Sequence, residues 1–415
     1  MRLVRAILDL ILALGLVTGG MAVAQSPRRA NWVASWEAAQ RLPEPENSLP
    51  PDELRNATLR QIVHLSIGGS RLRVHISNAF GTAAMHFTSV HIAMPISATS
   101  ARIDPATDKA LSFSGNSDAT VPAGAEYISD PINYGIASLS DLAVTLHIDA
   151  PPARQTGHPL ALATSYLVHG NQVSAPDLPN AKKFDHWFHL AAVDVDAPAD
   201  AACIVALGDS ITAGAGGTTN GNTRYTDVLA ERFSALPHKK AMGVLNAGIS
   251  GNHLLTDGPG ANALARFDSD VLAQAGVRYL IMLEGTNDLR GLTRNGEVSP
   301  TQHTVFIHRI ISSYEQIVVR SHAHGIKVIG ATILPITGTT YLSHGQSNEA
   351  DRQAINHWIR TSGRFDAVLD FDEVTRDPDH PERLLPVYDS GDHLHLSPAG
   401  YRALAKSIPL SLFTR

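Results

Sequence analysis

The hydrophobic and polar residues of this chain follow two different patterns, one in each half. Between residues 31 and 188, apolar residues alternate with polar ones in short runs that Gly, Pro, Asn and Asp separate. In the run Arg71–Ser77, for example, the alternate positions Leu72, Val74 and Ile76 are apolar. This alternation is typical of antiparallel sheets with one buried and one exposed face. The first half therefore predicts an all-β, sandwich-like domain.

Several short strands are expected in this β-rich half. They are Asn31–Trp36, Leu59–Ile67, Arg71–Ser77, Val90–Ala93, Ala110–Phe113, Leu142–Ile148 and Ser165–Val168. Gly68, Gly69 and Ser70 separate the second strand from the third, which predicts a β-hairpin.

From Cys203 onward, continuous apolar runs alternate with amphipathic segments. The apolar runs predict buried strands over Cys203–Leu207, Gly243–Asn246, Tyr279–Leu283, Lys327–Thr332 and Ala367–Asp370. The amphipathic segments predict helices over Tyr225–Ser234, Ala261–Ala273, Thr301–His324, Asn348–Ser362 and Pro398–Ser407. Buried strands that alternate with helices are typical of a parallel sheet covered on both faces, so the second half predicts an α/β domain.

The amino-terminal segment has the pattern of a signal peptide. Arg2 and Arg5 precede an apolar run, and an Ala-Val-Ala sequence at residues 22–24 supplies a cleavage site of small residues. We therefore expect a signal peptide over residues 1–24, cleaved after Ala24. The alternative is an uncleaved membrane anchor, but the apolar run is short and is interrupted by a charged residue and two glycines.

Length, charge and cysteine content agree with an exported protein of two domains. The 415 residues exceed what one core usually serves, which favours a β-rich domain over residues 25–195 and an α/β domain over residues 196–415. A net charge of −6 without basic runs argues against a nucleic-acid partner and against stable membrane binding after cleavage. The single cysteine, Cys203, excludes an intramolecular disulfide. We expect a secreted or periplasmic protein.

Polar segments gather at four places in the α/β half. They are Gly208-Asp209-Ser210, Asn246–Asn252, Glu284–Asp288 and Asp389–Ser397. The first three follow buried strands directly, and the carboxyl ends of parallel strands share one edge of a sheet. The fourth precedes the last helix and can fold back over the same edge, so we expect all four to meet.

These segments supply the residue types that acyl transfer requires. A serine hydroxyl becomes an effective nucleophile when a neighbouring base takes its proton, and histidine is suited to this near neutral pH. An acidic residue fixes the imidazole tautomer, and hydrogen-bond donors stabilise the oxyanion of the tetrahedral intermediate.

In order along the chain, the four segments resemble the four motif blocks of the SGNH (GDSL) hydrolase superfamily. The resemblance rests on Gly208-Asp209-Ser210, on Gly248 followed by Asn252, on Gly285-Thr286-Asn287-Asp288, and on Asp392 with His395. It covers residues 203–401 and implies a flavodoxin-like three-layer α/β/α domain. The β-rich half is similar to the N-terminal domain of secreted bacterial members, through Leu59-Arg60-Gln61 and residues 77–81.

The resemblance implies a role for each matching residue. Ser210 is expected as the nucleophile, and its own N–H as one oxyanion donor. Gly248 is expected as a backbone donor and Asn287 as a side-chain donor. His395 is expected as the base and Asp392 as the acid that orients it.

The residues left other interpretations open. His393 and Asp389 lie in the same segment as His395, and we favour His395 because it follows Asp392 by three residues. Asp209 and Asp288 are expected to support turns, Glu284 to be a paired core acid or to line the pocket, and Cys203 to be a small buried residue.

Arg266, Arg290 and Arg294 could bind an anionic substrate, although surface arginines are the simpler interpretation. The pairs His322-x-His324 and His393-x-His395 suggest a metal site as an alternative. No His-Glu-x-x-His sequence is present, however, so no metal and no cofactor is expected.

The expected function is therefore that of a secreted serine esterase that hydrolyses carboxylic esters through an acyl-enzyme. Its substrate would be a small ester or an acylated carbohydrate. The alternatives are a lipase or lysophospholipase, and a carbohydrate-binding protein on a hydrolase-like scaffold. The β-rich half could bind carbohydrate or could act only as a scaffold for one wall of the site.

Overall fold

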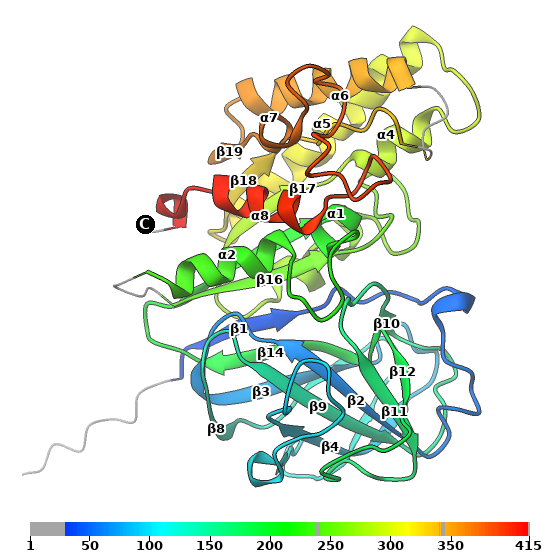
Figure 1. Ribbon diagram of the computed structural model, residues 1–415, viewed down its shortest axis with the longest axis vertical. Helices are drawn as coiled ribbons and strands as arrows, with labels where there is room; N and C mark the ends of the chain where they lie inside the picture. The colour runs from blue at the N-terminus through cyan, green and yellow to red at the C-terminus, as the bar shows by residue number, and fades with distance from the viewer. Residues whose placement is uncertain (1–29, 237–240, 340, 342–344, 414–415) are drawn as a thin grey trace, which may run out of the picture. The chain divides into compact units, whose positions relative to one another are not determined.

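The computed structural model describes residues 30–236, 241–339, 341 and 345–413 (Figure 1). The signal peptide expected over residues 1–24 lies outside this part of the chain. Among the described helices, none is long and apolar enough to cross a membrane.

The β-rich region consists of two main sheets of antiparallel strands and one short strand pair. The strands are β1 (Trp32–Glu37), β2 (Ala57–His64), β3 (Gly69–Ser77), β4 (Met85–Ala93), β5 (Lys109–Ala110), β6 (Ala119–Val121), β7 (Glu126–Ile128), β8 (Ile132–Ile136), β9 (Asp141–Ile148), β10 (Gly157–His158), β11 (Ser165–His169), β12 (Lys182–Phe184), β13 (Trp187–Phe188) and β14 (Leu190–Asp196). One sheet has the order β1-β14-β3-β7, with β8 also on β3, and the other has the order β12-β11-β2-β9-β4-β5, with β6 on β4. The short pair is β10 with β13.

The two main sheets share one apolar core. Val74 of β3 and Val193 of β14 belong to the same buried cluster as Leu59 of β2 and Val144 of β9. Alternate residues of each strand therefore pack between the sheets, as the alternation of apolar and polar residues predicts.

The hairpin expected around Gly68 is wrong, because β2 and β3 lie in different sheets. A Cβ atom on Gly68 would lie 2.2 Å from the carbonyl oxygen of Ile136. The glycine thus permits a close approach to β8 where the chain crosses from one sheet to the other. The strand expected over Ala110–Phe113 also differs from the structure, where β5 covers only Lys109–Ala110.

The α/β region is built on a parallel sheet. Its strands are β15 (Ala202–Gly208), β16 (Met242–Gly248), β17 (Val277–Leu283), β18 (Lys327–Ala331) and β19 (Ala367–Leu369). Its helices are α1 (Ser210–Ala213), α2 (Tyr225–Ser234), α3 (Ala263–Phe267), α4 (Thr286–Leu292), α5 (Pro300–Ala323), α6 (Gly345–Thr361), α7 (Phe371–Thr375) and α8 (Pro398–Ser407). The strand order β16-β15-β17-β18-β19 is 2-1-3-4-5 when counted along the chain from β15. The single helix expected over Ala261–Ala273 is instead α3 followed by a π-helical turn over Asp268–Leu272.

Alternate residues of β15 show that helices cover both faces of this sheet. Ile204 and Ala206 pack in a buried cluster with residues of α2 and α8. Val205 and Leu207 pack in the other cluster, which contains residues of α3, α5 and α6 (Figure 1). The strands are buried on both sides, which explains why their sequences are continuously apolar.

The β-rich and α/β regions pack directly on each other. Ala38, just after β1, forms a parallel bridge with Asn246 of β16. The N–H of Val244 donates to Ser66 Oγ at 3.0 Å. The apolar cluster between the two β-sheets also continues into the α/β region. Residues from Asn31 onward accordingly form one compact unit.

Candidate active site

The strand β15 ends in a sharp turn that leads into the one-turn helix α1. Gly208 is required there because a Cβ atom would lie 2.1 Å from Thr212 Oγ1. Asp209 caps the helix, since its Oδ1 accepts a hydrogen bond from the N–H of Ile211 at 2.9 Å. Ser210 is the first residue of α1 and is 6% exposed. The serine thus lies at the carboxyl end of a central strand.

Ser210, His395 and Asp392 form a continuous line of hydrogen bonds. Ser210 Oγ lies 2.8 Å from His395 Nε2, and His395 Nδ1 lies 2.6 Å from Asp392 Oδ2. With its Nδ1 proton donated to Asp392, the imidazole presents Nε2 as an acceptor for the serine hydroxyl. This arrangement can remove a proton from Ser210 and stabilise the imidazolium that results.

The carboxyl group of Asp392 stays ionised across the neutral range. Burial alone would raise its pKa, but the backbone N–H and the imidazole of His395 outweigh burial and lower the pKa to about 2. The N–H of Leu394 adds a further hydrogen bond to Oδ1 at 3.0 Å.

The second Asp–His pair of this segment faces elsewhere. His393 Nδ1 lies 2.5 Å from Asp389 Oδ2, and the N–H of His393 donates to the same carboxylate. The side chain of His393 is 56% exposed, and its φ is +60°. Of the two pairs that the sequence offered, the structure places Asp392 and His395 against Ser210.

The side chain of Asn287, on α4, lies beside the turn that carries Ser210. Its Nδ2 donates to the carbonyl oxygen of Asn252 at 2.9 Å and lies 3.5 Å from Asp209 Oδ2. Its Oδ1 accepts a hydrogen bond from Arg290 Nη1 at 2.7 Å. These contacts hold the NH₂ group of Asn287 toward the turn, where it donates to Asn252 and faces Asp209.

Gly248 contributes close packing, but its N–H is already engaged. A Cβ atom on Gly248 would lie 2.3 Å from the backbone nitrogen of Ala213, so α1 packs directly on this glycine. The N–H of Gly248 donates to Asn246 Oδ1 at 3.0 Å. The hydrogen bonding therefore does not support the expected role of Gly248 as an oxyanion donor.

Gly251, three residues further on, was not singled out from the sequence. Its φ is +77°, and its N–H makes no hydrogen bond to another residue of the described chain. It directly precedes Asn252, whose carbonyl oxygen contacts Asn287. The sequence does contain a signal for Gly251, since this glycine stands directly before the polar residue Asn252 within the second motif block.

Arg266 is neither a surface residue nor accessible to an anionic substrate, so both expectations for it are wrong. Its side chain is buried and donates to the carbonyl oxygens of Gly208 at 3.0 Å and Ala247 at 2.7 Å. It also donates to Asn252 Oδ1 at 2.9 Å. Arg266 thus joins the ends of β15 and β16 to the loop that contacts Asn287.

Two buried carboxyl groups lie beneath the site. Burial raises the pKa of Asp209 to about 6. Burial and the charge of Asp209 raise the pKa of Glu284 well above its ordinary value, and its Oε1 lies 3.4 Å from Arg266 Nη2. Glu284 is therefore a core acid. Asp288 caps a loop, as expected, by accepting the backbone N–H groups of Leu254 and Leu255 at 2.8 and 2.9 Å.

An aromatic ring lies next to the histidine. The centroids of the Tyr341 and His395 rings are 6.4 Å apart, in an edge-on arrangement. The guanidinium of Arg290 lies 5.0 Å from the centroid of the Tyr341 ring. Tyr341 is 51% exposed, so the residue beside His395 is open to solvent.

Of the remaining chemical candidates, Arg294 is exposed, whereas His322 and Cys203 have structural surroundings. His322 Nε2 lies 2.8 Å from Asp366 Oδ2. Cys203 is buried in β15, and burial raises the pKa of its thiol. Within the described ranges, no group of three or more His, Cys, Asp or Glu side chains could hold a metal ion.

Comparisons with known proteins relate the α/β region to acyl hydrolases. Residues 206–403 match the model of the GDSL-like Lipase/Acylhydrolase family. Similar solved structures include a lipolytic protein of the G-D-S-L family from Desulfitobacterium hafniense DCB-2, with 23% identity over 49% of this chain and 96% of that chain, at a TM-score of 0.36. An acetylxylan esterase from Geobacillus stearothermophilus has 20% identity over 52% of this chain and 94% of that chain, at a TM-score of 0.38. A GDSL-like lipase from Bacteroides thetaiotaomicron VPI-5482 has 18% identity over 51% of this chain and 87% of that chain, at a TM-score of 0.37. A comparison with curated proteins found no match.

Proposed function

We propose that this chain, whose residues 206–403 form a GDSL-like acylhydrolase domain, is a serine esterase that cleaves carboxylic esters through an acyl-enzyme. The observation that carries the proposal is the line from Ser210 through His395 to Asp392, with contacts of 2.8 and 2.6 Å. These distances are within the range over which a positioned base takes a proton from a hydroxyl.

The reaction has two halves. In the first, Ser210 Oγ bonds to the carbonyl carbon while its proton moves to His395 Nε2. The bond between that carbon and the alcohol oxygen then breaks, and the alcohol leaves with this proton. In the second half, water attacks the acyl carbon and gives a proton to His395. The bond to Ser210 Oγ breaks, the proton returns to the serine, and the free acid leaves. Asp392 stabilises the imidazolium in both halves.

Asn287 Nδ2 and the N–H of Ser210 supply two donors for the oxyanion of each tetrahedral intermediate. We assign the third donor to the N–H of Gly251, because that of Gly248 is bound to Asn246. Removing one such donor costs about 3–4 kcal/mol of transition-state stabilisation.

The substrate that we propose is an ester of a short acyl group with a carbohydrate. The exposed part of the Tyr341 ring beside His395 supports this, because a flat aromatic surface packs well against a sugar ring. The export signal expected over residues 1–24 fits a substrate outside the cytoplasm. A long-chain ester, as a lipase or lysophospholipase would cleave, is the second candidate, and a series of p-nitrophenyl esters of increasing acyl length separates the two.

Replacing the nucleophile tests the proposal. The wild-type protein should hydrolyse p-nitrophenyl acetate, and Ser210→Ala should lose about 10³-fold or more of this activity with unchanged circular dichroism. Mass spectrometry of the wild-type protein mixed rapidly with the ester should show one acetyl group on the peptide that contains Ser210. Retained turnover in the Ser210→Ala variant would overturn the serine mechanism. A wild-type protein that binds acetylated oligosaccharides without cleaving them would instead be a binding protein.

A further inference from the structure

The loop that follows the nucleophile helix is bound to the β-rich region. Residues 214–223 lead from α1 to α2, and Asn220 is their main contact with the segment before β11. Its N–H donates to the carbonyl oxygen of Leu162 at 2.8 Å. Its Oδ1 accepts the N–H of Thr164 at 2.7 Å, and its Nδ2 donates to Thr164 Oγ1 at 2.8 Å.

Arg224 connects the end of the nucleophile helix to the same segment. It is the residue before α2 and is 8% exposed. Its Nε donates to the carbonyl oxygen of Ala213, the last residue of α1, at 3.0 Å. Its Nη2 donates to the carbonyl oxygen of Ala161 in the β-rich region. One planar guanidinium therefore holds both carbonyl groups in a fixed relation.

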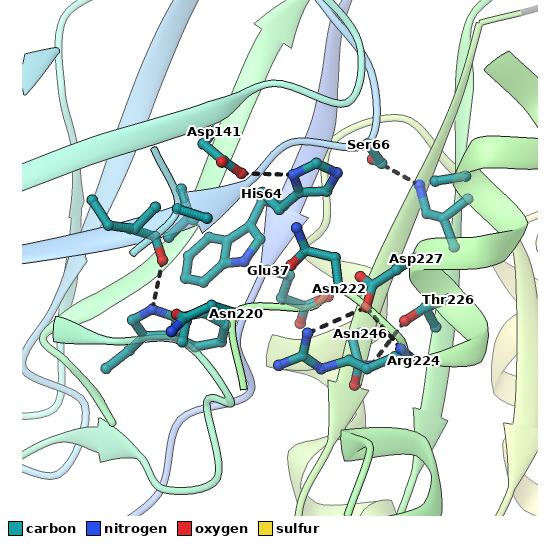
Figure 2. Close-up of a pocket in the computed structure, with 18 of the residues that line it drawn as sticks. Glu37, His64, Ser66, Asp141, Asn220, Asn222, Arg224, Thr226, Asp227 and Asn246 are labelled. Atoms are coloured by element: carbon teal, nitrogen blue, oxygen red, sulfur yellow. Dashed lines mark hydrogen bonds and ion pairs between the residues drawn. The ribbon is translucent and has the colours of Figure 1, made fainter. Parts of the chain in front are cut away.

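Figure 2 shows Arg224 and Asn220 at a small cavity of about 40 Å³ between the two regions. His64 and Asp141 line the β-rich side of this cavity, with His64 Nδ1 at 2.7 Å from Asp141 Oδ1. The guanidinium of Arg224 lies 6.0 Å from the ring centroid of Trp187, so an aromatic side chain of β13 also packs on it.

The helix α1 depends on such contacts for its position. It has only four residues, and a single helical turn is not stable by itself. The carbonyl oxygen of Thr212 accepts a hydrogen bond from Asn246 Nδ2 at 2.7 Å, and that of Ala213 accepts the one from Arg224. Both contacts continue into the β-rich region: the backbone of Asn246 bridges with Ala38, and the side chain of Arg224 donates to the carbonyl oxygen of Ala161.

The segment that receives Arg224 has a strained backbone. Leu160 and Leu162, on either side of Ala161, have φ values of +66° and +48°. Residues other than glycine seldom adopt this strained conformation, and it persists where surrounding contacts impose it. The strain places the carbonyl of Ala161 against the arginine.

We infer that the β-rich region positions the nucleophile, with Arg224 and Asn220 as positioning residues that fix the end of α1. The inference rests on the proposed function and assigns the β-rich region a part in catalysis, without a ligand of its own. Loss of the hydrogen bonds that Arg224 and Asn220 make with the β-rich region should let Ser210 Oγ move away from His395. A displacement of about 1 Å can reduce the rate a hundredfold.

The experiment compares Arg224→Lys and Arg224→Met with a matched control on the same helix, Arg232→Met. Arg232 also donates to backbone carbonyls, those of Ala405 and Ile408, but at the opposite end of α2. Competent sites are counted by titration with a fluorophosphonate, and kcat and KM for p-nitrophenyl acetate are measured per titrated site.

The expected result is a fall in kcat per site of about tenfold for Arg224→Lys and about a hundredfold for Arg224→Met, with KM changed less than about twofold. Arg232→Met should lower the melting temperature and leave kcat per site unchanged. If the Arg224 variants have fewer titrated sites but normal kcat at each, the link is only structural and the inference is overturned. An inactive wild-type protein would instead overturn the proposed function.

If the Arg224 variants do not fold, Asn220→Gly and Asn222→Gly decide the question. Both asparagines lie in the same loop with positive φ, +60° and +46°, so glycine suits both backbones. The side chain of Asn222, unlike that of Asn220, makes no hydrogen bond to another described residue. A lower kcat per site in Asn220→Gly alone supports the inference, and equal kcat in both variants overturns it.

Discussion

Ser210 Oγ and His395 Nε2 lie 2.8 Å apart, although 185 positions of the chain separate them. The serine comes from the end of β15, and the histidine from the loop before α8. That loop is closed on itself, since the N–H of Ser390 donates to the carbonyl oxygen of His395 at 3.0 Å. It also contacts the loop after α1, where a Cβ atom on Gly216 would lie 2.6 Å from the carbonyl oxygen of Leu396. The proposed catalytic contact thus depends on backbone packing as well as on the two side chains.

His395→Asn should reduce kcat/KM for p-nitrophenyl acetate by about 10³-fold or more, because the hydroxyl of Ser210 loses its proposed base. The matched control is His393→Asn, two residues away, whose ring contacts Asp389 instead. This control should keep at least half of the activity. Steady-state kinetics of both variants at equal folded concentration would settle the choice, and the opposite ranking would make His393 the base.

Asn287→Ala should lower kcat by about 10²–10³-fold with little change in KM, because in the proposed mechanism the side chain stabilises charge that develops only in the transition state. Arg290→Met should have a smaller effect of the same kind. It removes the hydrogen bond to Asn287 Oδ1 but leaves the contact of Nδ2 with the carbonyl oxygen of Asn252. An Asn287→Ala variant with normal kcat and a raised KM would show that the amide binds substrate in the ground state instead.

Tyr341→Ala should raise KM for an acetylated oligosaccharide by about tenfold and leave kcat for p-nitrophenyl acetate within about twofold. The reason is that the ring flanks His395, and the exposed part of Tyr341 is available to the substrate. Tyr341→Phe should behave like the wild-type protein, because it keeps the aromatic ring. Equal losses on both substrates would mean that the tyrosine acts on His395 and not on the carbohydrate.

The periodicity of the sequence located most of the α/β region. The expected helices over residues 225–234 and 398–407 agree with α2 and α8, because an amphipathic face against a buried strand leaves a clear signal. Local pattern could not show which strands pair, and the hairpin at Gly68 failed for that reason. The glycine serves a contact with β8, some seventy positions later at Ile136.

The sequence predicted those site residues whose side-chain chemistry is distinctive. It did not predict the role of residues whose function depends on their hydrogen-bond partners in the fold. Ser210, His395 and Asp392 were predicted from their resemblance, in order along the chain, to the SGNH motif blocks, and the structure brings the three side chains together. Whether the N–H of Gly248 is free depends on Asn246, two residues before it, which accepts that hydrogen bond. Arg266 has the sequence context of a surface residue, yet it donates to two carbonyl groups at the strand ends and to the side-chain oxygen of Asn252.

His75, on β3, should make the stability of the protein depend on pH. Its Nδ1 lies 2.7 Å from Glu126 Oε1 and its Nε2 lies 3.0 Å from Asp194 Oδ2. Burial alone would lower the pKa of His75, but the two carboxylates outweigh burial and raise the pKa to about 9. Because this value lies above the ordinary one near 6.5, the stabilisation is fully present below about pH 6.5 and is lost as the pH rises through about 9.

The loss should be on the order of 3 kcal/mol at most, because one pKa unit corresponds to about 1.4 kcal/mol and the partly exposed Glu126 is screened by solvent. The measurement is urea-induced unfolding of the wild-type protein and of His75→Gln at about pH 6 and about pH 9.5. In His75→Gln, most of the difference in the free energy of unfolding between the two pH values should disappear. The variant His91→Gln, on β4 of the other sheet, removes a contact of histidine with Asp108 and measures how much a different histidine–carboxylate pair contributes to that difference. If His75→Gln and the wild-type protein show the same pH dependence, the charge of His75 does not stabilise the β-rich region.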